Sequence, residues 1–285
     1  MTDRVRVAVV GAGTMGNGIA HTFAQHGHEV VLIDVAEAQL QKARQTIAGN
    51  IERQVKKSAM SAAEGDATLG RLSTTTERDE AAGAGLIIEA VPENRELKAG
   101  ILRSMDAVAG DAIIATNTSS ISITDLATNV SRPELFIGMH FMNPVPVMKL
   151  IEVIRGLQTS DETTRTVMEL SAALDRTPVE VNDYPGFVSN RVLMPMINEA
   201  VFCLMEGVAQ REAIDTVMKL GMNHPLGPLA LADLIGLDTC VSILEVLQRD
   251  LGEDKYRPCP LLRKYVAAGW LGRKTGRGFY SYGSQ

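Results

Sequence analysis

A histidine and a glutamate twelve residues apart are the side chains of this sequence best suited to acid–base chemistry. His140 lies in the apolar run Phe136–Phe141, and Glu152 lies in a second run, Leu150–Ile154, with two prolines between the runs. An imidazole titrates near neutral pH and can therefore accept a proton from a reacting group. A carboxylate on its other ring nitrogen would fix the tautomer and stabilise the imidazolium. For His140 alone, a hydrogen-bonded core residue at a strand end is the alternative.

A glycine loop near the N-terminus points to a second kind of chemistry. It reads Gly11-Ala12-Gly13-Thr14-Met15-Gly16, and it follows the β-branched run Val5–Val10. In the dinucleotide-binding pattern, Gly11 permits a tight turn, Gly13 lets the backbone approach a pyrophosphate, and Gly16 lets helix and strand pack closely. The phosphates then sit at a helix N-terminus, where free N–H groups favour anions. The loop, including Thr14 and Met15, is therefore expected to bind a dinucleotide, with an ordinary glycine-rich turn as the alternative.

An acidic residue in the expected place strengthens this interpretation. Asp34 follows a second apolar run and lies eighteen residues after Gly16. Its carboxylate can accept hydrogen bonds from ribose hydroxyls and would repel a 2′-phosphate. The next four residues contain no arginine that could receive such a phosphate. The sequence therefore predicts NAD, rather than NADP, as the cofactor.

The elements that position these groups alternate between strand and helix. Strands are expected at 5–10, 29–34, 86–91, 112–116, 136–141 and 150–154, with helices after the glycine loop and at 36–57 and 93–108. This alternation predicts a doubly wound parallel sheet, an α/β Rossmann-like N-terminal domain over residues 1–184. Residues 185–285 have helical patterns only. They are expected to form an all-α C-terminal domain that contributes substrate contacts and dimerisation, since the helix at 188–205 is apolar on nearly all faces.

Composition restricts the possible partners and the compartment. The chain has 285 residues, 45% of them apolar, and a net charge of −6, which argues against nucleic-acid and membrane-surface binding. Three widely spaced cysteines support neither a disulfide framework nor a zinc site, and no other metal site is expected. No signal-peptide pattern or membrane-length apolar run occurs. We therefore expect a soluble cytoplasmic protein.

Several motifs together give the chain a family resemblance. They are Thr116–Ser120, Gly138–Pro146, Glu152, Pro185–Arg191, Asn223–Pro228 and Gly272–Tyr280. In this order, over almost the whole chain, they resemble the L-3-hydroxyacyl-CoA dehydrogenase family, and especially its short bacterial members that act on 3-hydroxybutyryl-CoA. The resemblance implies an NAD-dependent, reversible oxidation of a (3S)-3-hydroxyacyl-CoA to a 3-ketoacyl-CoA, in fatty-acid or butanoate metabolism. The apolar helix at 188–205 separately favours a homodimer, with packing of that helix against the first domain as the alternative.

The resemblance also implies roles for individual residues. His140 matches the general base, Glu152 the carboxylate that orients it, and Ser119 and Asn190 two residues that contact the substrate. Because His140 and Asn190 come from opposite sides of the domain boundary, the active site is expected between the domains.

Other positions are assigned to the cofactor and to coenzyme A. Glu93 and Lys98 match family positions beside the cofactor, although a carboxylate at Glu93 could instead cap the following helix by dipole attraction. Asn117 lies just past the C-terminal end of a predicted strand, where open α/β sheets bind ligands, and is expected on the nicotinamide side. Lys56 and Lys57 could meet the phosphates of coenzyme A, or could simply end a polar helix, where lysines are favoured.

Three other functions are weighed against this one. A 3-hydroxyadipyl-CoA dehydrogenase of phenylacetate breakdown is the nearest enzyme alternative. Hydroxyisobutyrate-type dehydrogenases share the two-domain plan but use a catalytic lysine, which the His140–Glu152 pair disfavours. A non-catalytic NAD-binding protein, such as the related lens crystallin, is disfavoured by the complete set of Ser119, His140, Glu152 and Asn190.

Overall fold

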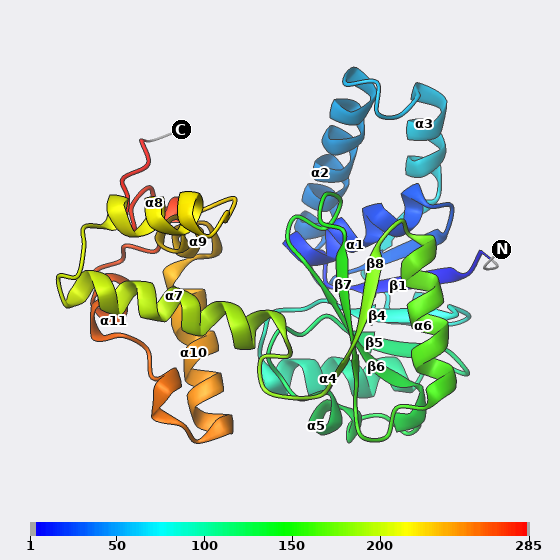
Figure 1. Cartoon of the computed structure of the whole chain (residues 1–285). Coiled ribbons are helices and arrows are strands. Elements are labelled where there is room, and N and C mark those ends of the chain that lie inside the picture. Colours follow the sequence, from blue (N-terminus) through cyan, green and yellow to red (C-terminus); the bar gives the residue numbers. More distant parts are fainter. Residues whose placement is uncertain (1–3, 284–285) are drawn as a thin grey trace. The chain divides into compact units, whose positions relative to one another are not determined.

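Two compact units make up the chain. The computed structural model describes residues 4–283, and the two units meet in sequence between Asp183 and Tyr184. Figure 1 colours the first unit from blue to green and the second from yellow-green to red.

The first unit is built on an eight-stranded sheet. The strand order is β3-β2-β1-β4-β5-β6-β7-β8. The strands are β1 (Arg6–Val10), β2 (Glu29–Ile33), β3 (Leu72–Thr75), β4 (Leu86–Glu89), β5 (Ile113–Thr116), β6 (Phe136–Phe141), β7 (Leu150–Arg155) and β8 (Thr177–Asn182). The central strands are almost wholly buried, which explains their continuous apolar runs.

Strand direction differs in one place from the expected parallel sheet. The strands from β3 to β6 are parallel, whereas β7 is antiparallel to β6, and β8 is parallel to β7. Residues 142–149 join β6 to β7, and this connection is too short for the helical crossover that parallel neighbours need. The α/β Rossmann-like class is confirmed, but the prediction of a wholly parallel sheet is wrong at these two strands.

Helices cover both faces of the sheet (Figure 1). They are α1 (Thr14–Gln25), α2 (Glu37–Lys56), α3 (Ala62–Gly70), α4 (Arg95–Asp106), α5 (Ile123–Ala127) and α6 (Asp161–Ala173). Side chains of α1, α2 and α6 share one apolar core with the sheet, in which Ile19 and Phe23 are fully buried. Helices α4 and α5 contact β4 and β6.

The second unit is helical. Its helices are α7 (Ser189–Met205), α8 (Arg211–Gly221), α9 (Pro228–Ile235), α10 (Leu237–Leu251) and α11 (Pro260–Ala267). They enclose a core of their own that includes Met194, Ile197 and Leu244. The predicted helical character of this part of the chain is confirmed. Among the described residues, no helix is long and apolar enough to cross a membrane.

The glycine-rich motif near the C-terminus serves the packing of this helical unit. Asp233 of α9 is buried, and its carboxylate accepts the backbone N–H groups of Phe279 and Tyr280, each at 2.9 Å. A Cβ atom on Gly278 would lie 1.9 Å from Asp233 Oδ1, and one on Gly272 would lie 2.3 Å from the Asp233 carbonyl oxygen. The motif therefore needs glycine because the backbone passes directly over Asp233.

A buried histidine couples the stability of the first unit to pH. His21 of α1 is fully buried. Burial, with smaller contributions from nearby His26 and Arg176, lowers the pKa of His21 from 6.5 to about 4. The unfolded chain takes up this proton near pH 6.5, whereas the folded chain does so only near pH 4. The stability from neutral His21 is therefore complete above about pH 6.5 and is lost as the pH falls toward 4.

We expect His21→Gln to flatten this pH dependence. In the unsubstituted protein, His21 should remove about 2–3 kcal/mol of unfolding free energy between pH 7.5 and pH 4.5, because each unit of pKa shift is worth about 1.4 kcal/mol. Urea unfolding at both pH values measures this loss, and His224→Gln in the other unit controls for removal of one histidine. If His21→Gln lost as much unfolding free energy between the two pH values as the unsubstituted protein, the assignment of this pH dependence to His21 would be contradicted.

Candidate active site

The candidate groups of the first unit gather where its parallel strands end. The register of the sheet aligns the carboxyl ends of β2, β1, β4 and β5 at one edge. Open α/β sheets bind their ligands outside this edge. The glycine loop follows β1, Asp34 follows β2, Glu93 follows β4, and Ser119 follows β5. Strand direction therefore brings together residues that are far apart in the sequence.

The glycine loop has the geometry that the sequence pattern predicts. Gly11 has a φ of +104°, and a Cβ there would lie 2.7 Å from the Ala90 carbonyl oxygen. A Cβ on Gly16 would lie 1.7 Å from the Gly11 carbonyl oxygen. A Cβ on Gly13 would have no heavy atom within 4 Å, so the space above this residue is open. Helix α1 begins after Gly13 without a side-chain cap, which leaves its N–H groups to an anion.

Asp34 is fixed at the end of β2 by two backbone groups. Its Oδ2 accepts the Ala12 N–H at 2.8 Å, and its Oδ1 accepts the Ala36 N–H at 3.0 Å. The carboxylate therefore ties the glycine loop to β2. Each oxygen retains acceptor capacity, which fits a ribose hydroxyl. The open space over Gly13, the uncapped helix and this acid together suit a dinucleotide.

A cavity of about 270 Å³ lies beside the glycine loop. It is bounded by the loop, by one side of α2, and by the turn after β6; Gly13, Lys42, Thr46, Asn50 and Asn143 are among its lining residues. The turn packs closely on α1, since a Cβ on Gly18 would lie 2.9 Å from the Val145 Cβ. The cavity therefore has polar groups and one cation along the α2 side.

His140 and Glu152 face each other across the antiparallel pair β6–β7. They are direct partners in the strand register, and His140 Nδ1 lies 2.8 Å from Glu152 Oε2. His140 is 8% exposed and Glu152 is 2% exposed. An ionised carboxylate can only accept a hydrogen bond, so in the neutral imidazole Nδ1 carries the proton and Nε2 the lone pair. In this tautomer the imidazole can take a proton at Nε2.

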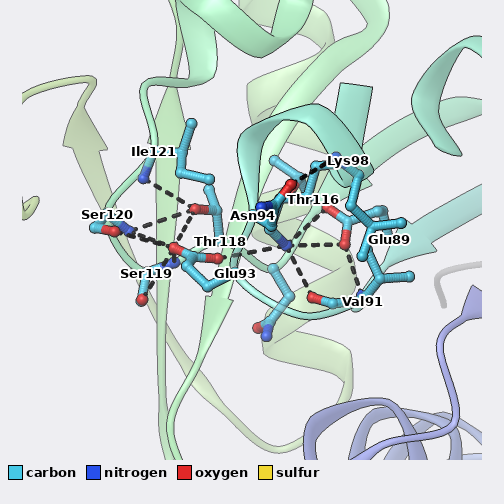
Figure 2. A network of polar contacts seen from close by, with 12 residues as sticks. Glu89, Val91, Glu93, Asn94, Lys98, Thr116, Thr118, Ser119, Ser120 and Ile121 are labelled. Carbon is cyan, nitrogen blue, oxygen red and sulfur yellow. Dashed lines mark hydrogen bonds and ion pairs between the residues drawn. The ribbon is translucent and has the colours of Figure 1, made fainter. Parts of the chain in front are cut away.

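A second cluster of charged groups connects the ends of β4 and β5 (Figure 2). Lys98 Nζ lies 2.8 Å from Glu89 Oε1 and 3.5 Å from Glu93 Oε2. Glu93 Oε1 accepts the Ser119 N–H at 2.9 Å and the Ser120 N–H at 3.0 Å. Although burial raises the pKa of Glu93, the Lys98 charge and these hydrogen bonds hold it below its usual range.

The helix-cap interpretation of Glu93 is wrong. Helix α4 begins at Arg95, and its N-cap is Asn94, whose side-chain oxygen accepts the Leu97 N–H at 2.9 Å. The Glu93 carboxylate turns instead to the segment after β5. Asn is a better N-cap than Glu because its short side chain reaches the free N–H groups of the first turn.

Comparison with known proteins gives the family. The family model described as 3-hydroxyacyl-CoA dehydrogenase, NAD binding domain, matches residues 6–184, and the model of the C-terminal domain of the same family matches residues 186–282. The chain belongs to the 3-hydroxyacyl-CoA dehydrogenase family. It is therefore an NAD-dependent dehydrogenase, which confirms the expected family, enzyme class and cofactor.

Three relatives within this family are similar over nearly their whole length. A probable 3-hydroxybutyryl-CoA dehydrogenase of Bacillus subtilis is 55% identical over 282 residues, which are 97% of each chain. A 3-hydroxybutyryl-CoA dehydrogenase of Bradyrhizobium diazoefficiens is 52% identical over 278 residues, 97% of this chain and 95% of the relative. The crystal structure of the (S)-3-hydroxybutyryl-CoA dehydrogenase PaaH1 of Ralstonia eutropha has a TM-score of 0.96 and 52% identity, covering 99% and 100% of the two chains.

The remaining residues predicted from the family resemblance take varied positions. Asn117 Oδ1 accepts the Phe141 N–H at 2.9 Å and so ties the end of β5 to β6. Asn190 lies on the first turn of α7, in the helical unit, and is 8% exposed. Lys56 pairs with Glu52 at 2.8 Å on the exposed end of α2, and Lys57 is the C-cap residue of that helix.

Glu89 was missed by the sequence analysis, although a signal was present. It is the last residue of β4, whose other members are Leu86, Ile87 and Ile88, and it is fully buried. A carboxylate at the end of a buried apolar strand needs a cation or hydrogen-bond donors. That requirement would have directed attention to Lys98, which is also fully buried.

The glycine loop generates a prediction with a matched pair of substitutions. Gly13→Ala should leave the melting temperature unchanged, because the new Cβ meets nothing, but should raise the Kd for NADH about tenfold or more by obstructing the pyrophosphate. Gly16→Ala should destabilise the fold by about 1–3 kcal/mol, because its Cβ overlaps the Gly11 carbonyl oxygen.

Thermal melts and NADH fluorescence titrations measure both effects. Gly100→Ala in α4, where a Cβ also meets nothing, is the control for replacing a glycine. Unchanged NADH affinity in Gly13→Ala would exclude the proposed approach of the pyrophosphate to this residue.

Proposed function

We propose that this protein catalyses the reversible oxidation of (3S)-3-hydroxybutyryl-CoA to acetoacetyl-CoA, with His140 as general base and Glu152 as its orienting carboxylate. The observation that carries the proposal is the 2.8 Å contact between His140 Nδ1 and Glu152 Oε2, in a unit matched by an NAD-binding family model. The named relatives support the choice of substrate, since two of them act on 3-hydroxybutyryl-CoA by name.

In the proposed reaction, His140 takes the proton of the substrate hydroxyl at Nε2. Glu152 keeps the proton of the imidazole on Nδ1 and stabilises the imidazolium that forms. The cofactor, held by the glycine loop and Asp34, supplies the hydride acceptor when bound. Loss of the hydroxyl proton together with the hydride avoids an alkoxide, which is a poor intermediate in water. In the reverse direction, the imidazolium returns the proton to the oxygen of the ketone.

Ser119 and Asn190 are proposed to contact the substrate. A serine hydroxyl can donate to the reacting oxygen, and an asparagine amide can donate to that oxygen or to the thioester carbonyl. The backbone N–H and the hydroxyl of Ser119 both contact Glu93 Oε1, at 2.9 Å and 3.1 Å, so the position of Ser119 is held by Glu93. Glu93 and Lys98 remain proposed cofactor neighbours on the family resemblance, and Asn117 on its place directly after β5.

Coenzyme A is proposed to lie along α2. Its phosphates need cations, and Lys56 and Lys57 end this helix, with Lys56 71% exposed at its side chain. Lys42, on the same helix, is a further cation and lines the cavity beside the glycine loop. The pairing of Lys56 with Glu52 is a surface contact of low energy, and a phosphate can displace it.

A homodimer formed through the helical unit, with substrate contacts from its residues, completes the proposal. Val192 of α7 is 67% exposed, and on α8 Val217 and Leu220 are 60% and 80% exposed. Apolar side chains exposed on two helices of one small unit suit a surface that a second copy covers.

The substrate choice is tested by the rate of NADH oxidation across four compounds. We expect kcat/KM for acetoacetyl-CoA to exceed those for 3-oxoadipyl-CoA, longer 3-ketoacyl-CoAs and free acetoacetate by about tenfold or more. Equal rates with free acetoacetate would show that the coenzyme A part of the substrate is not recognised. A higher kcat/KM for 3-oxoadipyl-CoA would identify 3-oxoadipyl-CoA as the preferred substrate instead.

The proposed base and orienter are tested by His140→Gln and Glu152→Gln. His140→Gln should lower kcat by about 10²–10⁴-fold and leave NADH binding intact, because glutamine cannot take the proton. Glu152→Gln should lower kcat less and alter the pH–rate profile, because the tautomer and the imidazolium lose their support. Steady-state kinetics, NADH titration and thermal melts separate these effects from unfolding.

Glu180→Gln on the neighbouring strand β8 is the matched control, since Glu180 is exposed. Near-normal turnover by His140→Gln would exclude it as the base. An unchanged pH–rate profile in Glu152→Gln would show that Glu152 does not support His140 as the base.

A further inference from the structure

Glu89 and Lys98 form a fully buried ion pair, and Glu89 has no role in the proposed reaction. Lys98 Nζ donates to Glu89 Oε1 at 2.8 Å, to Glu89 Oε2 at 3.0 Å and to the Val91 carbonyl at 3.2 Å. Glu89 also accepts the Val91 N–H at 2.7 Å and the Thr116 hydroxyl at 2.6 Å. Both charges are therefore compensated inside the protein, with β4, β5 and α4 all contributing.

Glu93 holds the segment 118–120 through a single oxygen atom. Its Oε1 accepts the Thr118 hydroxyl at 2.7 Å, the Ser119 N–H at 2.9 Å and the Ser120 N–H at 3.0 Å. The hydroxyls of Ser119 and Ser120 lie 3.1 Å from the same atom. The other oxygen, Oε2, is 3.5 Å from Lys98 Nζ (Figure 2). Glu93 thus stands between the ion pair and the segment.

One ammonium group is shared unequally by two carboxylates. Lys98 Nζ lies 2.8 Å from Glu89 Oε1 and 3.5 Å from Glu93 Oε2, so the ammonium group is 0.7 Å closer to Glu89. Without the Glu89 charge, a buried ammonium would be left with Glu93 as its counter-ion, because a buried charge needs a partner. Glu93 would then move toward Lys98 and away from the segment.

We propose that Glu89 is a positioning residue: by neutralising Lys98, it leaves Glu93 to hold the segment 118–120 that carries Ser119. The inference rests on the proposed function only for the substrate contact of Ser119. That Glu93 holds the segment 118–120 is independent of the proposed function, because it follows from the hydrogen bonds of Glu93 Oε1.

The direct test is amide hydrogen exchange of the cofactor-free protein. In Glu89→Gln, exchange at the Ser119 and Ser120 amides should accelerate about tenfold or more, because both N–H groups donate to Glu93. The double variant Glu89→Gln/Lys98→Met should return these amides toward their original rates, since no ammonium then competes for Glu93. Such non-additivity is expected for groups within one charge network.

Two further variants sharpen the test. Glu96→Gln removes an exposed carboxylate from the same helix and should leave the two amides unchanged. Thr116→Val removes one hydrogen bond to Glu89 but keeps the charge that neutralises Lys98, and should leave the two amides near their original rates. Accelerated exchange in Thr116→Val would overturn the proposal even if Glu89→Gln does not fold. Unchanged exchange at Ser119 and Ser120 in a folded Glu89→Gln would overturn the proposal. Faster exchange in the double variant than in Glu89→Gln would also overturn it.

Kinetics then connect the segment to the reaction. In Glu89→Gln, kcat/KM for acetoacetyl-CoA should fall about tenfold, and adding Glu93→Gln should cost little more because Glu93 has already left the segment. If the effects of Glu89→Gln and Glu93→Gln on kcat/KM were fully additive, the inference would be contradicted. If the unsubstituted protein does not turn over acetoacetyl-CoA, the proposed function fails, while the exchange experiment still decides the role of Glu89.

Discussion

The candidate site depends on one constraint, the direction of the strands. Parallel strands bring their carboxyl ends to one edge, so the glycine loop, Asp34 and the segment after β5 converge although they are far apart in sequence. The antiparallel return of β7 adds the remaining component. It places Glu152 opposite His140 in the register, so the two side chains meet on one face of the sheet. A parallel β7 would need a crossover and would lose this pairing.

Three carboxylates of the candidate site are held by hydrogen bonds that they accept from N–H and O–H groups. Asp34 accepts two backbone N–H groups, Glu93 accepts N–H and hydroxyl groups of one segment, and Glu152 accepts the His140 ring. A carboxylate bonded in this way keeps its orientation before a ligand arrives. Groups that are oriented in advance need not be reorganised when a ligand binds.

The sequence predicts the groups of this site better than it predicts their contacts. The glycine loop and Asp34 follow from spacing, because each position has a steric or electrostatic requirement visible in one short motif. The edge strands β3 and β8 escape prediction because both are largely polar and carry no apolar run. The partner of Glu93 also escapes prediction, since it depends on tertiary packing between the ends of β4 and β5. His140 and Glu152 lie between these cases: both are prominent in sequence, but only the short connection between their strands implies that they face each other.

Two carboxylates hold successive parts of the chain after β5. Glu93 holds the segment 118–120, and Asp183 holds the start of α5 by accepting the Ile123 N–H at 3.0 Å and the Thr124 N–H at 2.8 Å. Asp183 is the last residue of the first unit. The chain therefore leaves this unit at the residue that holds the start of α5. Ser119 is bonded through Glu93 to the buried Glu89–Lys98 pair, whereas the start of α5 is bonded to Asp183. Glu93 therefore ties Ser119 to the interior of the unit, and Asp183 ties the helix that follows to the end of the unit.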